Sequence, residues 1–323
     1  MHSMWKLQQY YQYMLLLVGI LIIALTTNDI CTCRALSLPP QLQKTVTRGL
    51  LVQPPGRPDV FILGTIHVGS ESAEEASLLI KTVRPSTVVV EVAPSRLSLI
   101  RKRNNENNES NDSSTVQVQT ALMSLPALAQ KGWTTGGAGG LIFATTILWG
   151  SLMKRSLTAR EETDTLPRTN EFAAAIAAAD AIGSIVMASD MEIEELMGSV
   201  AQSMNRAPME WISLGLNVVR QSIGVQEADP IRRRKDESLV QWAERRRNIA
   251  TARASRAHGE ATAPCISRVL VNERDEIFAE SCVKALQLSR GEDDPVEGSV
   301  IGNVTVCVVG LVHLDGVVER LKL

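Results

Sequence analysis

Residues 59–67, DVFILGTIH, carry a strong fold signal and lead to the first candidate site residue. The four apolar residues 60–63 form an unbroken run, which is typical of a strand buried on both faces of a parallel sheet. Gly64 follows, and we expect it to let the backbone turn sharply because it has no Cβ to clash. His67 lies three residues further on, so the sequence predicts an imidazole just past the carboxyl end of this strand.

The same pattern returns near the C-terminus, in residues 304–313, VTVCVVGLVH. An apolar run is again followed by a glycine, Gly310, then by two residues and a histidine, His313. The chain of 323 residues contains only four histidines, and chance would rarely place two of them at matched positions. We therefore interpret His67 and His313 as the centre of a functional site.

Strand and helix patterns alternate between these two stretches. Further strands are predicted at residues 86–91 and 184–189, and helices at 70–83, 170–182 and 265–289, with a loop at 257–263. This alternation favours an α/β fold whose central sheet, largely parallel or mixed, is flanked by helices. A run of Asn, Glu and Ser at 104–115 predicts a disordered, solvated insertion within a domain that extends over residues 58–320.

Residues 1–38 are predicted to be a targeting leader rather than part of the fold. A lysine precedes the apolar run at 14–26, which is shorter than the ~20 residues that a membrane-spanning helix needs. This layout is typical of a secretory signal peptide and predicts routing into the secretory pathway. Two alternatives stay open: an uncleaved signal anchor that gives membrane association, and a plastid or mitochondrial targeting leader.

The composition and net charge of the chain limit the classes of binding partner that we expect. Hydrophobic residues make up 45% and charged residues 21% of the chain, so most of it is expected to be globular. The net charge of -2 gives no argument for a nucleic-acid partner. Basic clusters in residues 231–256 fit either a solvated helix face or a contact with an anionic surface. The apolar segment 132–153 fits either a buried core helix or a membrane span.

Four predicted strands end in a polar side chain: His67, Glu91, Asp190 and His313. Ligands of open α/β sheets bind at the carboxyl ends of the strands, so these side chains can face one crevice. Two histidines with one or two carboxylates form the ligand set of a catalytic divalent metal with an open coordination position. Structural roles stay open too, since Glu91 could cap the next turn and Asp190 could cap a helix that starts at 191. Arg274 and Asp275 could form an exposed ion pair of little energetic value.

Five short motifs occur along the chain: GTIH at 64–67, VVVEVAPSR at 88–96, NEF at 170–172, ERD at 273–275 and VVGLVH at 308–313. In this order and approximate spacing, they resemble the motifs of the TraB/PrgY family. The resemblance covers about residues 58–320. Taken together the motifs are specific, whereas any one of them alone would be a weak signal.

The resemblance implies the fold and chemistry of a wider clan, which groups TraB with Tiki proteases, erythromycin esterase-like (EreA) proteins and haem-binding ChaN. That fold is α/β with two strand-Gly-x-x-His elements. Tiki proteases depend on a metal, which implies a divalent ion here (Mn, Co or Zn) and a peptide or protein substrate. His67 and His313 would then be ligands, and Glu91 a ligand or the base that activates water. Arg274 would stabilise the oxyanion. Further candidate site residues are Gly64, Thr65, Arg96, Glu171, Asp190, Asp275 and Gly310.

The implied function is a metal-dependent hydrolase of the peptidase type, but two departures keep other functions open. Family members usually have Gly-Gly-Glu before the Ala-rich helix, where this chain has RTNE at 168–171. They also tend to have Gly-Asp-Arg-Pro after the third strand, where this chain has SDME at 189–192. The alternatives are a non-catalytic protein that binds a peptide or a cofactor such as haem, and a membrane-associated scaffold.

Overall fold

The computed structural model describes residues 38–66, 70–109, 130, 133–134, 137, 170–213, 216, 237–290 and 304–322. Several sequence predictions fall outside these residues: the leader up to 37, His67, the insertion from 110 on, most of 132–153 and the basic cluster at 232–235. Leu38, predicted to end the leader, is buried. No helix within the described ranges has the length and apolar character needed to cross a membrane.

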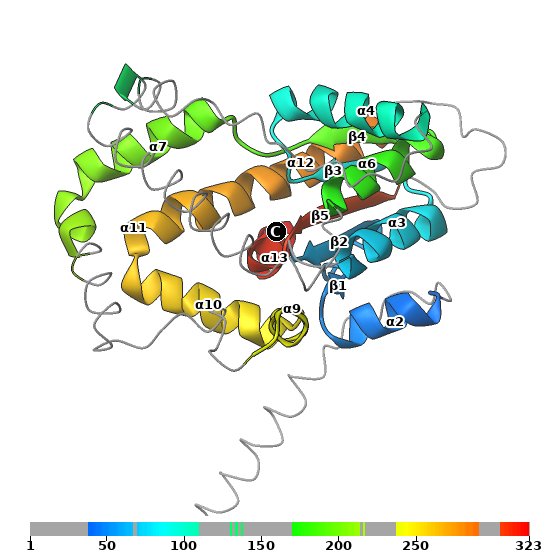
Figure 1. Cartoon of the computed structure of the whole chain (residues 1–323), viewed down its shortest axis with the longest axis horizontal. Coiled ribbons are helices and arrows are strands. Elements are labelled where there is room, and N and C mark those ends of the chain that lie inside the picture. The colour runs from blue at the N-terminus through cyan, green and yellow to red at the C-terminus, as the bar shows by residue number, and fades with distance from the viewer. Residues whose placement is uncertain are drawn as a thin grey trace, which may run out of the picture. The chain divides into compact units, whose positions relative to one another are not determined.

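A five-stranded mixed sheet forms the centre of the fold (Figure 1). The strands are β1 (Leu51–Val52), β2 (Val60–Thr65), β3 (Thr87–Val90), β4 (Ile185–Ala188) and β5 (Thr305–Gly310). They lie in the order β1-β2-β5-β3-β4, and each neighbouring pair is parallel except the antiparallel pair β1 and β2. The predicted α/β fold with a mixed sheet flanked by helices is confirmed.

β2 and β5, the strands of the two matched stretches, lie side by side in the sheet. Their pairing runs from Val60 opposite Thr305 to Thr65 opposite Gly310, so both strands end at the same level. Every residue of both strands is buried, as their apolar runs predict. Cys307, in the middle of β5, is the buried thiol that its position indicated. The carboxyl ends of the two matched strands therefore lie side by side at one edge of the sheet.

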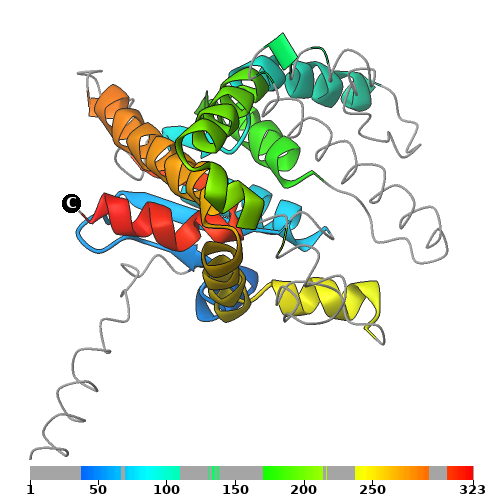
Figure 2. The ribbon, with the colours of Figure 1, turned by 90° about the vertical axis from the view of Figure 1, so that its left-hand side faces the viewer.

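Helices cover both faces of the sheet (Figure 2). Those described with bounds are α2 (Pro40–Thr47), α3 (Glu71–Val83), α4 (Pro94–Glu109), α6 (Glu171–Ala181), α7 (Ile193–Arg206), α9 (Leu239–Arg246), α10 (Ile249–Thr262), α11 (Pro264–Ser267), α12 (Glu273–Arg290) and α13 (Leu314–Leu321). α3 packs against α6 on one face, and α12 against α13 on the other. Alternation along β2 separates the faces, because Val60 and Ile62 join the core cluster of α12 and α13, whereas Phe61 and Leu63 are buried outside it.

The sharp backbone turn predicted at Gly64 is wrong, because Gly64 lies inside β2. Its role is close packing: a Cβ there would come within 2.6 Å of Leu311 Cδ1 and 3.3 Å of Leu311 Cα. Leu311 opens the 3-10 turn η2 (Leu311–His313), which follows β5 directly. The glycine therefore lets the turn that carries His313 settle against the end of β2.

Both ends of the predicted Ala-rich helix are confirmed in α6. The Asn170 side chain accepts hydrogen bonds from the N–H groups of Phe172 (3.0 Å) and Ala173 (3.2 Å), as an N-cap does. After the other end, Gly183 has φ of +76°, a left-handed conformation that glycine adopts without a Cβ clash. The chain then passes directly into β4.

Two segments predicted to be irregular are helical instead. α4 continues to Glu109 through the first half of the expected insertion, and the Asn104 side chain donates to the Ala173 carbonyl of α6 at 3.1 Å. α10 runs through the loop expected from 257, because the alanines there favour a helix more than Gly259 opposes it. The single helix expected over 265–289 is divided into α11, the π-helical turn η1 (Arg268–Asn272) and α12.

Two arginines in the described part of the basic segment 231–256 bind carboxylates. Arg247 is 5% exposed and binds Glu75 of α3, and Arg245 binds Glu237 of the same segment at 2.7 Å. A solvated helix face or a contact with an anionic surface would leave an arginine exposed. Both interpretations are therefore wrong for Arg247.

Candidate functional site

Three strands deliver polar side chains to one place at their carboxyl ends. Glu91 follows β3 directly, Asp190 follows β4 by two residues, and His313 closes η2 after β5. Arg274, in the first turn of α12, contacts all three of these side chains. We refer to Glu91, Asp190, Arg274, Asp275 and His313 as the strand-end cluster.

The Arg274 guanidinium forms the centre of the strand-end cluster, and each of its nitrogens is engaged. Nε and Nη2 donate to the two carboxylate oxygens of Asp190, at 2.8 and 2.9 Å. Nη2 also donates to Glu91 Oε1, and Nη1 donates to the Leu270 carbonyl at 3.2 Å. Nη1 lies 3.4 Å from His313 Nε2. The guanidinium is thus held by three strands' ends and by the π-helical turn before α12.

Burial and the neighbouring carboxylates act in opposite directions on this arginine. Desolvation lowers the pKa of the Arg274 guanidinium, whereas Glu91 and Asp190 raise it, and the balance leaves the pKa above its ordinary value. The side chain is only 16% exposed. A permanent positive charge therefore stands in a site from which most water is excluded.

Glu91 is bound on both of its carboxylate oxygens. Oε1 accepts from Arg274, and Oε2 accepts from the Gly310 N–H at 2.5 Å. Gly310 is the last residue of β5, which neighbours β3, so the carboxylate bridges the ends of two adjacent strands. Only 8% of the Glu91 side chain is exposed. Its orientation is therefore fixed by the sheet itself.

His313 presents one ring nitrogen to the cluster and uses the other for support. Nδ1 lies 2.7 Å from Asp275 Oδ1, and the ring meets the Phe278 ring edge-on, with centroids 5.1 Å apart. A carboxylate at this distance accepts from a nitrogen that bears hydrogen, and in the neutral imidazole the other nitrogen, Nε2, then carries the lone pair. Nε2 lies 3.7 Å from Glu91 Oε1. This is the tautomer in which Nε2 can bind a metal ion.

Asp275 is fully buried and is held by two arginines. Arg256 Nη1 donates to Asp275 Oδ2 at 2.8 Å, and Arg320 Nη1 lies 3.6 Å from the same oxygen. Gly316 makes the room, since a Cβ there would come within 1.8 Å of Asp275 Oδ2. Sequence reasoning missed Arg256 and Gly316, because neither stands in a motif and no local pattern relates α10 or α13 to Asp275.

Six candidate residues from the sequence meet here: Glu91, Asp190, Arg274, Asp275, Gly310 and His313. Of the others, Arg96 is exposed in the first turn of α4, and Glu171 is buried at the start of α6. The Thr65 hydroxyl is buried beside β5, where it donates to the Val309 carbonyl at 3.2 Å. His67 lies outside the described residues, so its role as a ligand stays a prediction.

Two structural alternatives raised by the sequence are wrong. Asp190 does not cap a helix at 191, because α7 begins at Ile193 with Glu192 in the N-cap position. One Asp190 oxygen accepts the N–H of the next residue, but the carboxylate as a whole binds Arg274. Arg274 and Asp275 form no exposed ion pair, since successive helix residues point about 100° apart and these two side chains bind different partners, Asp190 and Arg256.

Two of the three predicted metal ligands lie among the described residues, and their atoms fit a shared divalent ion. The 3.7 Å between His313 Nε2 and Glu91 Oε1 is close to the roughly 3.4 Å that separates neighbouring ligand atoms of a tetrahedral zinc ion. The Asp275 carboxylate on Nδ1 is the usual support of a metal-binding histidine. Within the residues that the structure describes, no three or more His, Cys, Asp or Glu side chains surround a common metal position. His67 lies outside these residues.

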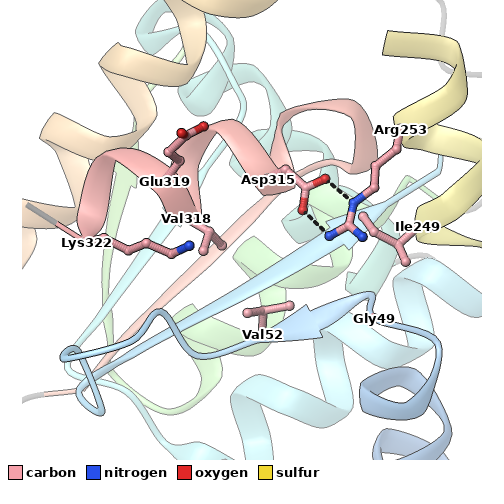
Figure 3. Close-up of a pocket in the computed structure, with 8 residues that line it drawn as sticks. All are labelled: Gly49, Val52, Ile249, Arg253, Asp315, Val318, Glu319 and Lys322. Carbon is pink, nitrogen blue, oxygen red and sulfur yellow. Dashed lines mark hydrogen bonds and ion pairs between the residues drawn. The ribbon is translucent and has the colours of Figure 1, made fainter. Parts of the chain in front are cut away.

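A separate hollow of about 390 Å³ lies on another part of the surface (Figure 3). Its lining residues are Gly49, Val52, Ile249, Arg253, Asp315, Val318, Glu319 and Lys322. Arg253 donates to both carboxylate oxygens of Asp315 at its rim, at 2.6 and 2.9 Å. No residue of the strand-end cluster lines it. The hollow and the cluster are therefore separate features of the structure.

A scan against protein-family models finds no match for this chain, and a search of curated proteins finds none either. The resemblance to the TraB/PrgY family therefore rests on the five motifs in the sequence. The geometry of the strand-end cluster carries the functional argument.

Proposed function

We propose that this chain is a divalent-metal-dependent hydrolase that acts on peptides or proteins and is similar to the TraB/PrgY family. One observation carries the proposal: His313 Nδ1 lies 2.7 Å from Asp275 Oδ1, which directs the other ring nitrogen, Nε2, toward the cluster, 3.7 Å from a Glu91 oxygen. A buried carboxylate–histidine pair beside a second carboxylate is the support that hydrolytic metal sites use. The EreA/ChaN-like pair of strand-Gly-x-x-His elements, with His67 as the third ligand, forms part of this proposal.

The residues of the cluster divide the work of hydrolysis between them. His313 and Glu91 would hold the divalent ion (Mn, Co or Zn), together with His67. When bound, such an ion lowers the pKa of water and polarises a carbonyl group. Glu91, fixed by the Gly310 N–H, is also placed to accept a proton from the attacking water. Arg274 supplies positive charge for the developing oxyanion.

The cellular compartment of the protein is a second part of the proposal. The apolar run at 14–26, preceded by a lysine, supports routing into the secretory pathway, with a retained anchor giving membrane association. A plastid or mitochondrial leader is the alternative. Expression with a C-terminal fluorescent tag would decide, since secretory routing predicts co-localisation with endoplasmic-reticulum markers, and plastid or mitochondrial fluorescence would contradict it.

One observation favours a second candidate, a protein that binds a peptide or a cofactor without catalysis. Both oxygens of Glu91 are already bound, one by Arg274 and one by the Gly310 N–H. If that arrangement is permanent, the cluster is a buried ion-pair network that holds strand ends together. Binding of metal to the purified chain separates the two candidates.

The test combines metal analysis with a peptide-library cleavage assay on the purified full chain. The hydrolase proposal predicts about one equivalent of Mn, Co or Zn per chain and cleavage that a chelator abolishes. His313→Ala should lose both, while Arg253→Gln, at the separate hollow, should keep both. Wild-type protein that holds no metal after incubation with each ion, or metal content unchanged in His313→Ala, would contradict the proposal.

A further inference from the structure

Arg274 stands where a cation is expected if the proposed metal site is correct. Its Nη2 binds Glu91 Oε1 and its Nη1 lies 3.4 Å from His313 Nε2. These two acceptor atoms are the ones assigned to the metal, and they lie 3.7 Å apart. The guanidinium therefore occupies the same electrostatic position as the ion, between the same two partners.

The guanidinium can leave Glu91 without losing its other anchors. Asp190 binds it through Nε and Nη2, at 2.8 and 2.9 Å, and the Leu270 carbonyl binds Nη1 at 3.2 Å. A bidentate arginine–carboxylate pair is stable without further partners, because two parallel hydrogen bonds fix its geometry and the two opposite charges balance. Leu270 belongs to η1, and π-helical turns within helices are often found at functional sites. Only the contacts to Glu91 and to His313 Nε2 have to be given up.

We propose that Arg274 is a built-in counter-cation for Glu91, which yields the carboxylate to a divalent metal ion and then remains on Asp190. This inference rests on the proposed metal-dependent function and adds a regulatory step to it. In the metal-free protein the guanidinium neutralises Glu91 and holds it in place. In the metal-bound protein, the Nη2 hydrogen that Arg274 had donated to Glu91 would be available to donate a hydrogen bond to the substrate.

The proposal predicts that one substitution, at Arg274, raises the affinity for metal instead of lowering it. Removing a residue that supports a metal site weakens metal binding, and removing a residue that acts only on the substrate leaves it unchanged. Removing a competing cation strengthens metal binding, because two like charges within a few ångströms repel strongly where water is excluded. Arg274→Gln should therefore bind the divalent ion more tightly than the wild type does.

The experiment is titration calorimetry of the metal-stripped full chain with MnCl2 and, separately, ZnCl2. We expect the dissociation constant of Arg274→Gln to fall at least about tenfold below that of the wild type. Arg253→Gln is the matched control, since it removes an arginine that also binds one carboxylate through Nε and Nη2, and it should bind as the wild type does.

Arg274→Met protects the test against misfolding of the glutamine variant, which near-ultraviolet circular dichroism would reveal. Methionine is also long but carries no charge, so it too removes the competing cation, and this variant should also bind metal more tightly than the wild type. Equal or weaker binding by the folded variants, beside clear binding by the wild type, would overturn the inference and leave the metal site standing. Absence of binding in every variant would instead remove the proposed function and the inference together.

Discussion

Two arginines of this chain bind a carboxylate in the same way but in different surroundings. Arg274 donates through Nε and Nη2 to Asp190, and Arg253 donates through the same two atoms to Asp315. The side chains of the first pair are 16% and 21% exposed, and those of the second pair are 63% and 38% exposed. Arg274 also contacts Glu91 and His313, whereas Arg253 and Asp315 only form part of the rim of a surface hollow.

The two pairs have the same hydrogen bonds, so they differ in their burial and in the further charged residues that they contact. Water screens an exposed ion pair, which contributes within about 1 kcal/mol to stability. In the strand-end cluster, charges that are shielded from water depend on one another, and loss of one partner leaves the next one buried and unpaired. The same residue types therefore stabilise the surface slightly at one place and form a buried cluster of mutually dependent charges at the other.

The largest effect on stability is expected at Asp275. Asp275→Asn keeps the shape of the side chain but removes the charge that binds His313, Arg256 and Arg320. The new amide group would also point its hydrogens at one of these donors. We expect the free energy of unfolding to fall by about 3–5 kcal/mol, measured by urea denaturation. A loss below about 1 kcal/mol would show that the cluster behaves like the exposed pair.

A smaller effect is expected at Gly316, which makes room for Asp275. Gly316→Ala should lower the free energy of unfolding by about 1–3 kcal/mol, because the new Cβ would displace Asp275 Oδ2, 1.8 Å away. Gly198→Ala in α7 is the matched control, since nothing lies within 4 Å of its Cβ position. That change should raise stability by up to about 1 kcal/mol. Equal effects of the two substitutions would contradict the packing described here.

The smallest effect is expected at the exposed pair. Asp315→Asn is the counterpart of Asp275→Asn, and its amide can be solvated because the Asp315 side chain is 38% exposed. The free energy of unfolding should change by less than about 1 kcal/mol at low salt, and by still less at high salt. A loss as large as that of Asp275→Asn would erase the contrast between the two regions.

The sequence was sufficient to predict the elements that depend on local patterns. The apolar runs predicted β2, β3 and β5, and the helix predicted at 170–182 agrees with α6 to within one residue at each end, because capping and turn chemistry act within a few residues. The strand ends also predicted that Glu91, Asp190 and His313 would meet, since parallel strands present their carboxyl ends at one edge of a sheet.

What the sequence could not predict depends on contacts between distant elements. Gly64 is needed because Leu311 packs against it, and the late strand had to be placed beside β2 before that contact could be seen. Arg256 supports Asp275 from α10, across the π-helical turn η1, which shifts the register of the helix that follows. No periodic pattern carries that shift, so the directions of Arg274 and Asp275 could not be predicted.

The central claim is that Glu91 and His313 share one divalent ion, and cobalt absorption tests it most directly. Addition of Co²⁺ to the metal-stripped full chain should produce visible absorption bands that saturate at about one equivalent, as expected of a site with nitrogen and oxygen ligands. Both Glu91→Gln and His313→Ala should lose these bands, while Arg253→Gln should keep them. Bands that persist unchanged in both cluster variants, or that never appear in the wild type, would contradict the claim.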